Sequence, residues 1–254
     1  MKKAKNIEDV DPAYTSLYKL GGAAAFTAAG LTLSEVIVFF LYPQPGTVSG
    51  WFMLFQRDRI IGLLDFWGLE VPMYAMFILV FLALYIVLRK ADAGLMIIAI
   101  AFALLGSGIF FATNNPFSML SLSDQYIHAT THEQKAMVLA AGQVLLTNTN
   151  QRAIGGFNMG LFLVSLAGLI VSWAMLRGKS FKRSIAYVGL LAHALSLADY
   201  LRQTLTSSPV FALLVILPNA LLLVIWYVLV GQRLYQLGHL QQMALRQRPS
   251  EAFK

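Results

Sequence analysis

Residues 93–113 read AGLMIIAIAFALLGSGIFFAT, an apolar run without a single charged side chain. An α-helix rises about 1.5 Å per residue, so about 20 apolar residues cross the ~30 Å hydrocarbon layer of a bilayer. The whole chain shares this character, because it is 58% hydrophobic and only 12% charged. One small water-soluble core cannot bury that much apolar surface. The sequence therefore predicts an integral membrane protein whose main partner is the lipid bilayer.

The same criterion finds further apolar stretches along the chain and predicts an all-α, polytopic transmembrane bundle of six helices. The expected spans are 17–42, 60–88, 93–113, 154–176, 184–203 and 209–231. Residues 1–16 are then an N-terminal cytoplasmic segment, 17–231 the transmembrane domain with an outer loop at 114–153, and 232–254 a basic cytoplasmic tail. Regularly spaced leucines in that tail fit either an amphipathic helix on the inner leaflet or a partner-binding segment.

Lysine and arginine gather at the ends of the apolar stretches. With both termini inside, roughly 14 of the 19 Lys and Arg lie on the inner side, as the positive-inside rule requires. This bias accounts for the net charge of +7 without a nucleic-acid partner. It also predicts a multi-pass protein of the cell inner (plasma) membrane.

No cofactor is expected from the sequence. The chain contains no cysteine, which removes disulfides, thiolate metal sites and iron–sulfur clusters. Lys19 and Lys90 stand at helix ends, so no buried lysine is available for a Schiff base. His193 is the only histidine in the six expected spans, whereas a membrane cytochrome commonly needs paired axial histidines.

The outer loop is expected to contain a helix of its own. Thr131 and Gln134 fit a capping box, and the apolar run that follows, from 136 to 146, is too short to cross a bilayer. Two interpretations remain open: a helix that forms a lid over the bundle, and a packed helical loop.

Polar residues inside the spans give the main indication of function, because such residues commonly face a bundle interior or a watery cavity. Counted from the basic ends, Glu35, Glu70, Asn158 and Asp199 lie roughly 22 to 29 Å up their helices, near the outer edge of the bilayer. Asp65 lies slightly higher, and His193 lies near the midplane. We expect these six residues to line an outward-facing acidic cavity that binds a small polar or cationic ligand, a lipid headgroup or a partner. Transport is a variant of this function.

Structural explanations compete for some of these residues. Asp199 and Arg202 are three residues apart and could pair on one helix, and Asp65 could be a solvated carboxylate at the interface. Glu35 and Glu70 lie more than about ten residues from any Lys or Arg, so burial would leave them protonated, paired with another helix or bound to a cation.

His128 and His132 suggest the alternative function. Histidines at i and i+4 on a helix can chelate a metal, and His193 or an acid could complete the site. The alternative is therefore a membrane-embedded metal-dependent hydrolase. A helix cap at Thr131 would separate the two histidines and weakens this interpretation.

Small residues and prolines predict details of packing. Gly21, Ala25 and Ala29 form a small-residue stripe, and Gly156 and Gly160 form a GxxxG pair. Such stripes bring helices close within one bundle or across a homo-oligomer interface. Pro72 and Pro218 predict kinks in the second and sixth spans.

Four short motifs resemble a family of bacterial integral membrane proteins catalogued as a domain of unknown function. They are Phe55-x-x-x-Arg59-Ile60, Ala83-Leu84-Tyr85-x-x-Leu88-Arg89, Glu133-Gln134 and Phe157-Asn158-Met159-Gly160-Leu161. The resemblance covers about residues 55 to 205. It implies a six-helix fold in a bacterial inner membrane and brings no activity or catalytic residue with it.

Overall fold

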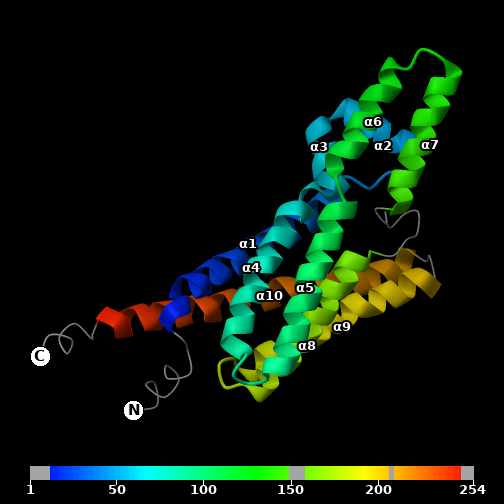
Figure 1. The fold of residues 1–254 in the computed structure, drawn as a ribbon. Coiled ribbons are helices and arrows are strands. Elements are labelled where there is room, and N and C mark those ends of the chain that lie inside the picture. The colour runs from blue at the N-terminus through cyan, green and yellow to red at the C-terminus, as the bar shows by residue number, and fades with distance from the viewer. Residues whose placement is uncertain (1–11, 149–157, 206–208, 247–254) are drawn as a thin grey trace, which may run out of the picture.

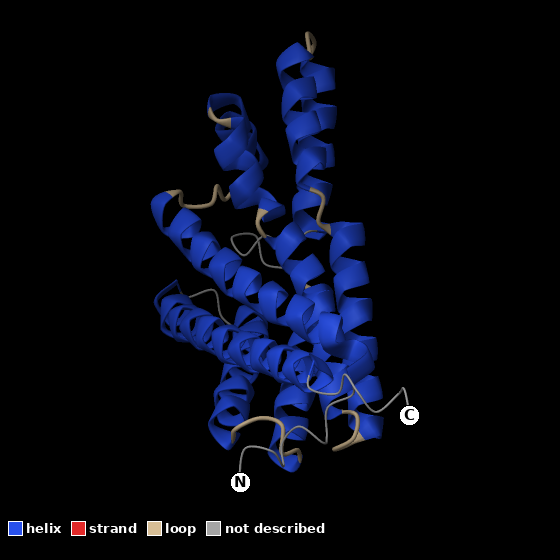
Figure 2. Cartoon of the chain, turned by 90° about the vertical axis from the view of Figure 1, so that its left-hand side faces the viewer, coloured by secondary structure: helices blue, strands red, loops and turns tan. Residues whose placement is uncertain are grey.

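The computed structural model describes residues 12–148, 158–205 and 209–246. Within these ranges the chain is helical and contains no β-strand (Figure 2). A short 3₁₀ turn, η2 (Pro12–Tyr14), precedes the first long helix. The helices are α1 (Thr15–Leu41), α2 (Val48–Arg57), α3 (Arg59–Leu63), the π-helical turn η3 (Leu64–Gly68), α4 (Glu70–Leu88), α5 (Ala93–Thr113), α6 (Pro116–His128), α7 (His132–Asn148), α8 (Met159–Arg177), α9 (Arg183–Leu205) and α10 (Pro209–Arg246) (Figure 1).

Five segments of the described chain are long and apolar enough to cross a bilayer, which makes this a multi-pass membrane protein. They are Thr15–Leu41, Arg59–Leu88, Ala93–His128, Met159–Arg177 and Leu214–Leu240. Each of them overlaps one of the expected spans. The remaining expected span, 184–203, coincides with the helix α9, and its crossing of the membrane stays a prediction.

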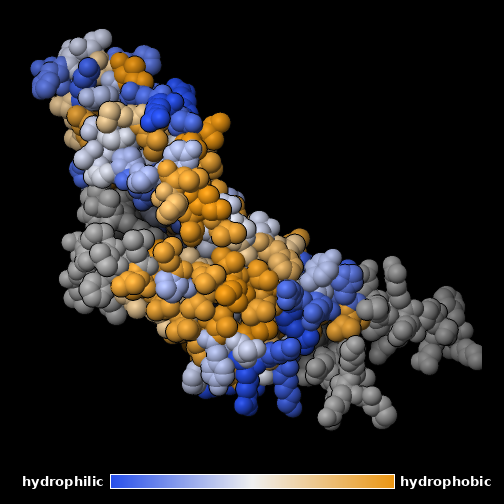
Figure 3. All heavy atoms as spheres, turned by 180° about the vertical axis from the view of Figure 1, so that it is seen from behind, coloured by the Kyte–Doolittle hydropathy of each residue, from blue (hydrophilic) through white to orange (hydrophobic). Residues whose placement is uncertain are grey.

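The surface is banded in the way that a bilayer requires. In Figure 3 hydrophobic side chains cover the middle of the visible face, and hydrophilic side chains gather toward its two ends. Exposed apolar residues on several helices belong to this band, among them Ile97 and Leu105 on α5 and Leu221 on α10. A bilayer supplies the apolar solvent that such a band needs.

Helices α1 and α10 run side by side and cross the other long helices (Figure 1). Glycines allow their close approach: a Cβ on Gly22 would lie 3.1 Å from the carbonyl oxygen of Gly231. The predicted stripe contributes on the other side of α1, where a Cβ on Gly21 would lie 2.4 Å from the Cβ of Ala83 on α4. Close van der Waals packing at small residues therefore holds these helices together, because burial of apolar surface does not drive helix association in lipid.

A second glycine crossing joins α5 to α8. A Cβ on Gly106 would lie 2.6 Å from the carbonyl oxygen of Gly160, and one on Gly160 would lie 2.8 Å from that of Gly106. Gly156, the other half of the predicted GxxxG pair, lies outside the described residues. At the far end of the same two helices, Asp92 caps α5 through Leu95 N (3.1 Å) and forms an ion pair with Arg177 of α8. Packing and capping thus fix α5 and α8 at both ends.

The second expected span is broken rather than kinked at Pro72. The backbone leaves helical geometry at Phe66 (φ −98°, ψ 67°) and Trp67 (φ 64°, ψ 8°), and α4 starts afresh at Glu70. Pro72 falls in the first turn of α4, where its missing N–H costs no intrahelical hydrogen bond. The break therefore precedes the proline and turns Asp65, Phe66 and Trp67 inward, where all three are buried.

Pro218, the second proline expected to kink a span, lies inside an uninterrupted helix. Helix α10 runs from Pro209 to Arg246 as one helix that contains Pro218. It carries the last apolar segment directly into residues 232–246, so this part of the expected tail continues the same helix. Residues 247–254 lie outside the described part of the chain.

The segment expected to be the outer loop contains a helical hairpin, α6 and α7. Helix α6 begins after Asn115, whose side chain accepts from Phe117 N (3.0 Å), and α6 itself was not expected from the sequence. The predicted capping box at the start of α7 is confirmed, because Thr131 and Gln134 exchange hydrogen bonds of 3.2 Å. The hairpin contacts α2 and projects beyond the long helices (Figure 1).

Candidate functional site

A cavity of about 520 Å³ lies among α1, α4, α8, α9 and α10. Its lining comes from the last turns of α1, the first turns of α4 and α8, the second half of α9 and the first half of α10. A volume of several hundred Å³ is in the range that holds a small organic molecule. The break at η3 matters here, because it lets α4 begin at the cavity with Glu70 in its first turn.

Three carboxylates line this cavity: Glu35 on α1, Glu70 on α4 and Asp199 on α9. Glu70 and Asp199 are only 3% and 6% exposed, and Glu35 is partly buried. Among the described lining residues there is no lysine, arginine or histidine. A carboxylate is costly in apolar surroundings unless it is paired or hydrogen bonded, and each of these three makes an interaction within the protein.

Three hydrogen-bond donors also line the cavity and make no hydrogen bond within the described structure. They are the indole N–H of Trp67, the hydroxyl of Tyr74 and the amide NH₂ of Asn158. All three residues are more than nine-tenths buried. A buried donor without an acceptor costs about 1–3 kcal/mol, so an acceptor inside the cavity would stabilise the protein.

Aromatic side chains hold the walls in place. The ring of Tyr74 stacks on Phe110 with 3.8 Å between the centroids, and Phe77 stacks on Tyr227 at 5.4 Å. Trp67 meets Phe110 edge to face at 5.9 Å. Indole and phenol faces attract cations. The walls are therefore a rigid apolar surface that contains indole and phenol rings.

A polar bridge closes the wall between α9 and α10. The hydroxyl of Ser196 and the amide of Asn219 are hydrogen bonded, with 3.0 Å between Ser196 Oγ and Asn219 Nδ2. Ser196 also donates to the carbonyl oxygen of Ala192 (3.2 Å). This bridge joins two helices at a cavity wall without adding charge.

Trp67 adopts a backbone conformation that a non-glycine residue rarely takes. Its φ of 64° is the only positive value for a non-glycine residue in the described chain. Such a residue costs about 1–3 kcal/mol and persists only where its surroundings hold it. Packing against Phe110 holds Trp67 at the cavity wall.

Of the six residues predicted to bind a ligand, four line this one cavity: Glu35, Glu70, Asn158 and Asp199. The Oδ1 atom of Asn158 also caps α8 by accepting from Leu161 N (3.0 Å). The structure thus brings together polar groups from four helices. Their binding of a ligand stays a prediction.

Asp65 and His193 do not belong to the described lining. Asp65 is fully buried, so the interpretation as a solvated carboxylate is wrong, because the break at η3 turns it inward. His193 packs edge to face on Trp226 at 4.8 Å in the interface of α8, α9 and α10. Gly168 makes room for its ring, because a Cβ there would lie 2.2 Å from the imidazole.

Sequence reasoning missed Trp67, Tyr74 and Asn219 as lining residues. Tyr74 stands four residues after Glu70, a spacing that shares one helix face. Asn219 is a polar residue in an apolar span, which is itself an indication of function. Nothing in the sequence marks Trp67, because its position follows from the break in the backbone.

His128 and His132 lie on different helices. His128 ends α6, where its Nδ1 lies 2.7 Å from the carbonyl oxygen of Asp124, and His132 begins α7. In the part of the chain that the structure describes, no three His, Cys, Asp or Glu side chains are placed to hold one metal ion. The i, i+4 geometry that motivated the metal site is therefore not formed by these two residues.

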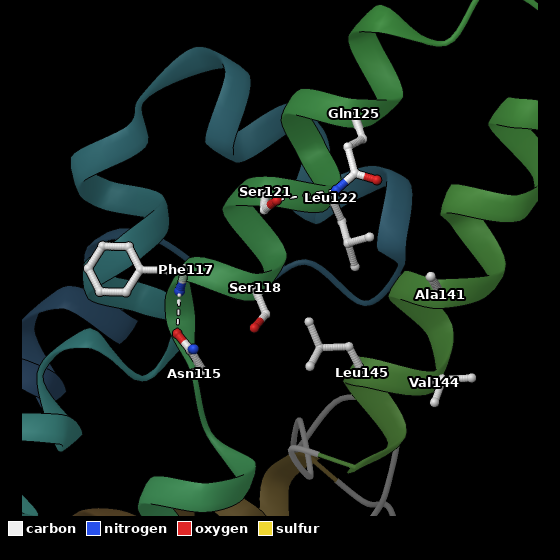
Figure 4. Close-up of a pocket in the computed structure, with 9 residues that line it drawn as sticks. All are labelled: Asn115, Phe117, Ser118, Ser121, Leu122, Gln125, Ala141, Val144 and Leu145. Carbon is white, nitrogen blue, oxygen red and sulfur yellow. Dashed lines mark hydrogen bonds between the residues drawn. The ribbon is translucent and has the colours of Figure 1, made fainter.

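A second hollow, of about 550 Å³, lies between α6 and α7 (Figure 4). Ser118, Leu122 and Gln125 of α6 face Ala141 and Leu145 of α7 across it (Figure 4). None of its described lining residues carries a titratable side chain. The hollow offers hydroxyl and amide groups but no charge, so the cavity among the long helices is the better candidate.

Residues 63–231 match the model of a family described as "Domain of unknown function (DUF4386)". The chain belongs to this family. The family resemblance that the sequence suggested over about residues 55 to 205 is therefore confirmed, and the match covers residues 63–231. No curated protein and no solved structure matches the chain. The matched region holds Glu70, Asn158 and Asp199, whereas Glu35 precedes it.

Proposed function

We propose that this protein is a six-span protein of the inner membrane that binds an organic ammonium cation in the cavity among α1, α4, α8, α9 and α10. The observation that carries the proposal is the lining, which combines the carboxylates of Glu35, Glu70 and Asp199 with aromatic walls. On the predicted topology this cavity opens toward the outer side. A quaternary or protonated amine is attracted by these carboxylates while its carbon substituents contact the rings.

An organic cation fits this lining better than a metal ion does. Calcium, for example, takes six to eight oxygen ligands at about 2.3–2.6 Å. Among the described residues, no three His, Cys, Asp or Glu side chains are placed to hold one metal ion. A cation with its charge distributed over several carbons interacts with separate carboxylates and with the aromatic side chains that line the cavity, Trp67, Tyr74 and Tyr227.

The test compares choline with 3,3-dimethylbutanol, its uncharged carbon analogue, by calorimetric titration of the protein in lipid nanodiscs. We expect choline to bind and the neutral analogue to bind at least tenfold more weakly, because only choline is attracted by the carboxylates. Glu70→Gln should weaken choline binding about tenfold or more, since it removes one charge and keeps the shape of the side chain.

The matched control is Glu133→Gln, the same substitution at an exposed position of α7. It should bind choline as the unmodified protein does. Equal binding of choline and its neutral analogue, or unchanged binding by Glu70→Gln, would contradict the proposal.

A further inference from the structure

The rim of the cavity is apolar and exposed. Four side chains that line it are also about half or more exposed: Ile37 (50%), Phe40 (84%) and Leu41 (61%) on α1, and Leu217 (51%) on α10. All four belong to segments long and apolar enough to cross a bilayer. Side chains of this kind are stable when they face lipid. The cavity therefore has an edge in contact with hydrocarbon.

This edge lies where α1 and α10 frame the cavity. Nearer the N-terminus of α1 the two helices are in close contact, because a Cβ on Gly22 or Gly231 would lie about 3 Å from the facing backbone. At the other end of α1, residues 35–41 and residues 216–223 of α10 line the cavity between them. The pair is thus closed at one end and separated by the cavity at the other.

We infer that the ligand is an amphiphile: an ammonium group with a neutral oxygen beside it, on an alkyl chain that leaves the cavity between α1 and α10 into the bilayer. This inference rests on the proposed function and adds the class of ligand and its route. The ammonium group is held by the carboxylates, and the chain lies over Phe40, Leu41 and Leu217.

The neutral oxygen follows from the three donors. Trp67, Tyr74 and Asn158 each present a buried N–H or O–H to the cavity without an acceptor in the described structure. A hydrogen-bond acceptor on the ligand would therefore satisfy these donors. An anionic acceptor would bring a like charge next to Glu35, Glu70 and Asp199, which line the same cavity, and would be repelled by them. A hydroxyl, ether or carbonyl oxygen satisfies the donors without that repulsion.

The experiment uses dodecyl(2-hydroxyethyl)dimethylammonium, a long-chain choline, with a photoreactive diazirine in the middle of its chain. The protein in lipid nanodiscs is irradiated with this probe, and the adducts are mapped by peptide mass spectrometry. We expect adducts concentrated on residues 37–41 of α1 and 214–221 of α10. Excess choline should reduce these adducts at least fivefold, whereas lipid-facing positions on α5 such as Ile97 and Leu105 should show no such competition.

The two proposals fail in different ways. If choline binds but the rim adducts are absent, or are not reduced by choline, the amphiphile and its lateral route are wrong while the ammonium site stands. If choline itself does not bind, the proposed function is wrong. The competition needs no substituted protein, so the result does not depend on the folding of a variant. Glu70→Gln adds a second measurement, and it should lose the rim adducts.

Discussion

Buried polar atoms are the features at the scale of the residue that most need an explanation. In a folded protein nearly all of them are hydrogen bonded, so each exception requires a reason. Three such donors, on Trp67, Tyr74 and Asn158, line one cavity. They come from different parts of the chain, and their convergence supports a ligand or ordered water as their missing acceptor.

Tyr74→Phe tests this explanation. The change removes a buried hydroxyl that makes no hydrogen bond in the described structure, so the free energy of unfolding of the ligand-free protein should stay the same or rise by up to about 1–3 kcal/mol. Affinity for a ligand that accepts this hydrogen bond should fall about five- to tenfold, the value of one typical hydrogen bond. Both effects are measurable by melting and titration of the same preparation.

Tyr187→Phe is the control, because Tyr187 is 58% exposed and does not line the cavity. It should change neither quantity. A loss of more than about 1.5 kcal/mol of stability in Tyr74→Phe would instead indicate that the Tyr74 hydroxyl has an acceptor within the protein.

At the scale of the element, glycine contacts decide which helices approach closely. Helix α5 has glycines on two faces: Gly106 meets the backbone of Gly160 on α8, whereas a Cβ on Gly108 would meet nothing within 4 Å. The two positions share one helix and differ only in what faces them. They therefore separate the effect of helix packing from the effect of glycine itself.

Gly106→Leu should destabilise the bundle by about 1–3 kcal/mol or more, because its side chain would overlap the Gly160 carbonyl and force α5 away from α8. Gly108→Leu should leave stability unchanged or raise it by up to about 1 kcal/mol through better helix propensity. Thermal unfolding in the same detergent measures both. Equal effects of the two substitutions would show that the α5–α8 contact does not limit stability.

At the scale of the whole molecule, charge predicts how the bundle is oriented. The turn between α8 and α9 carries Arg177, Lys179, Lys182 and Arg183, while the α6–α7 hairpin belongs to the less basic side. The positive-inside rule places the first in the cytoplasm and the second outside. On this orientation the cavity lies nearer the outer side, because Glu35 and Glu70 lie at the ends of their helices that are closer to the hairpin.

Because the chain has no cysteine, single cysteines report this orientation directly. Ala136→Cys on α7 and Lys179→Cys between α8 and α9 both replace exposed residues. A membrane-impermeant maleimide added to intact cells should label Ala136→Cys at once and Lys179→Cys only after permeabilisation. The reverse pattern would invert the topology and place the cavity toward the cytoplasm.

Local information in the sequence determined the helical class, the membrane environment, the approximate ends of α1, α5 and α9 and the capping box at Thr131 and Gln134. Apolar run length and hydrogen bonds between near neighbours fix these features, so they can be read without tertiary contacts. The sequence also singled out Glu35, Glu70, Asn158 and Asp199, since polar residues are costly in hydrocarbon wherever they stand.

Only the tertiary structure decided which of these residues share a cavity. The left-handed turn at Trp67 breaks the second span, buries Asp65 and starts α4 at Glu70, and no propensity indicates a tryptophan in that conformation. Gly168 gives His193 a place between helices, away from the cavity lining. The physical reason is that a cavity is bounded by residues distant in the chain. Its shape therefore depends on how helices cross, which the pattern along any single helix does not specify.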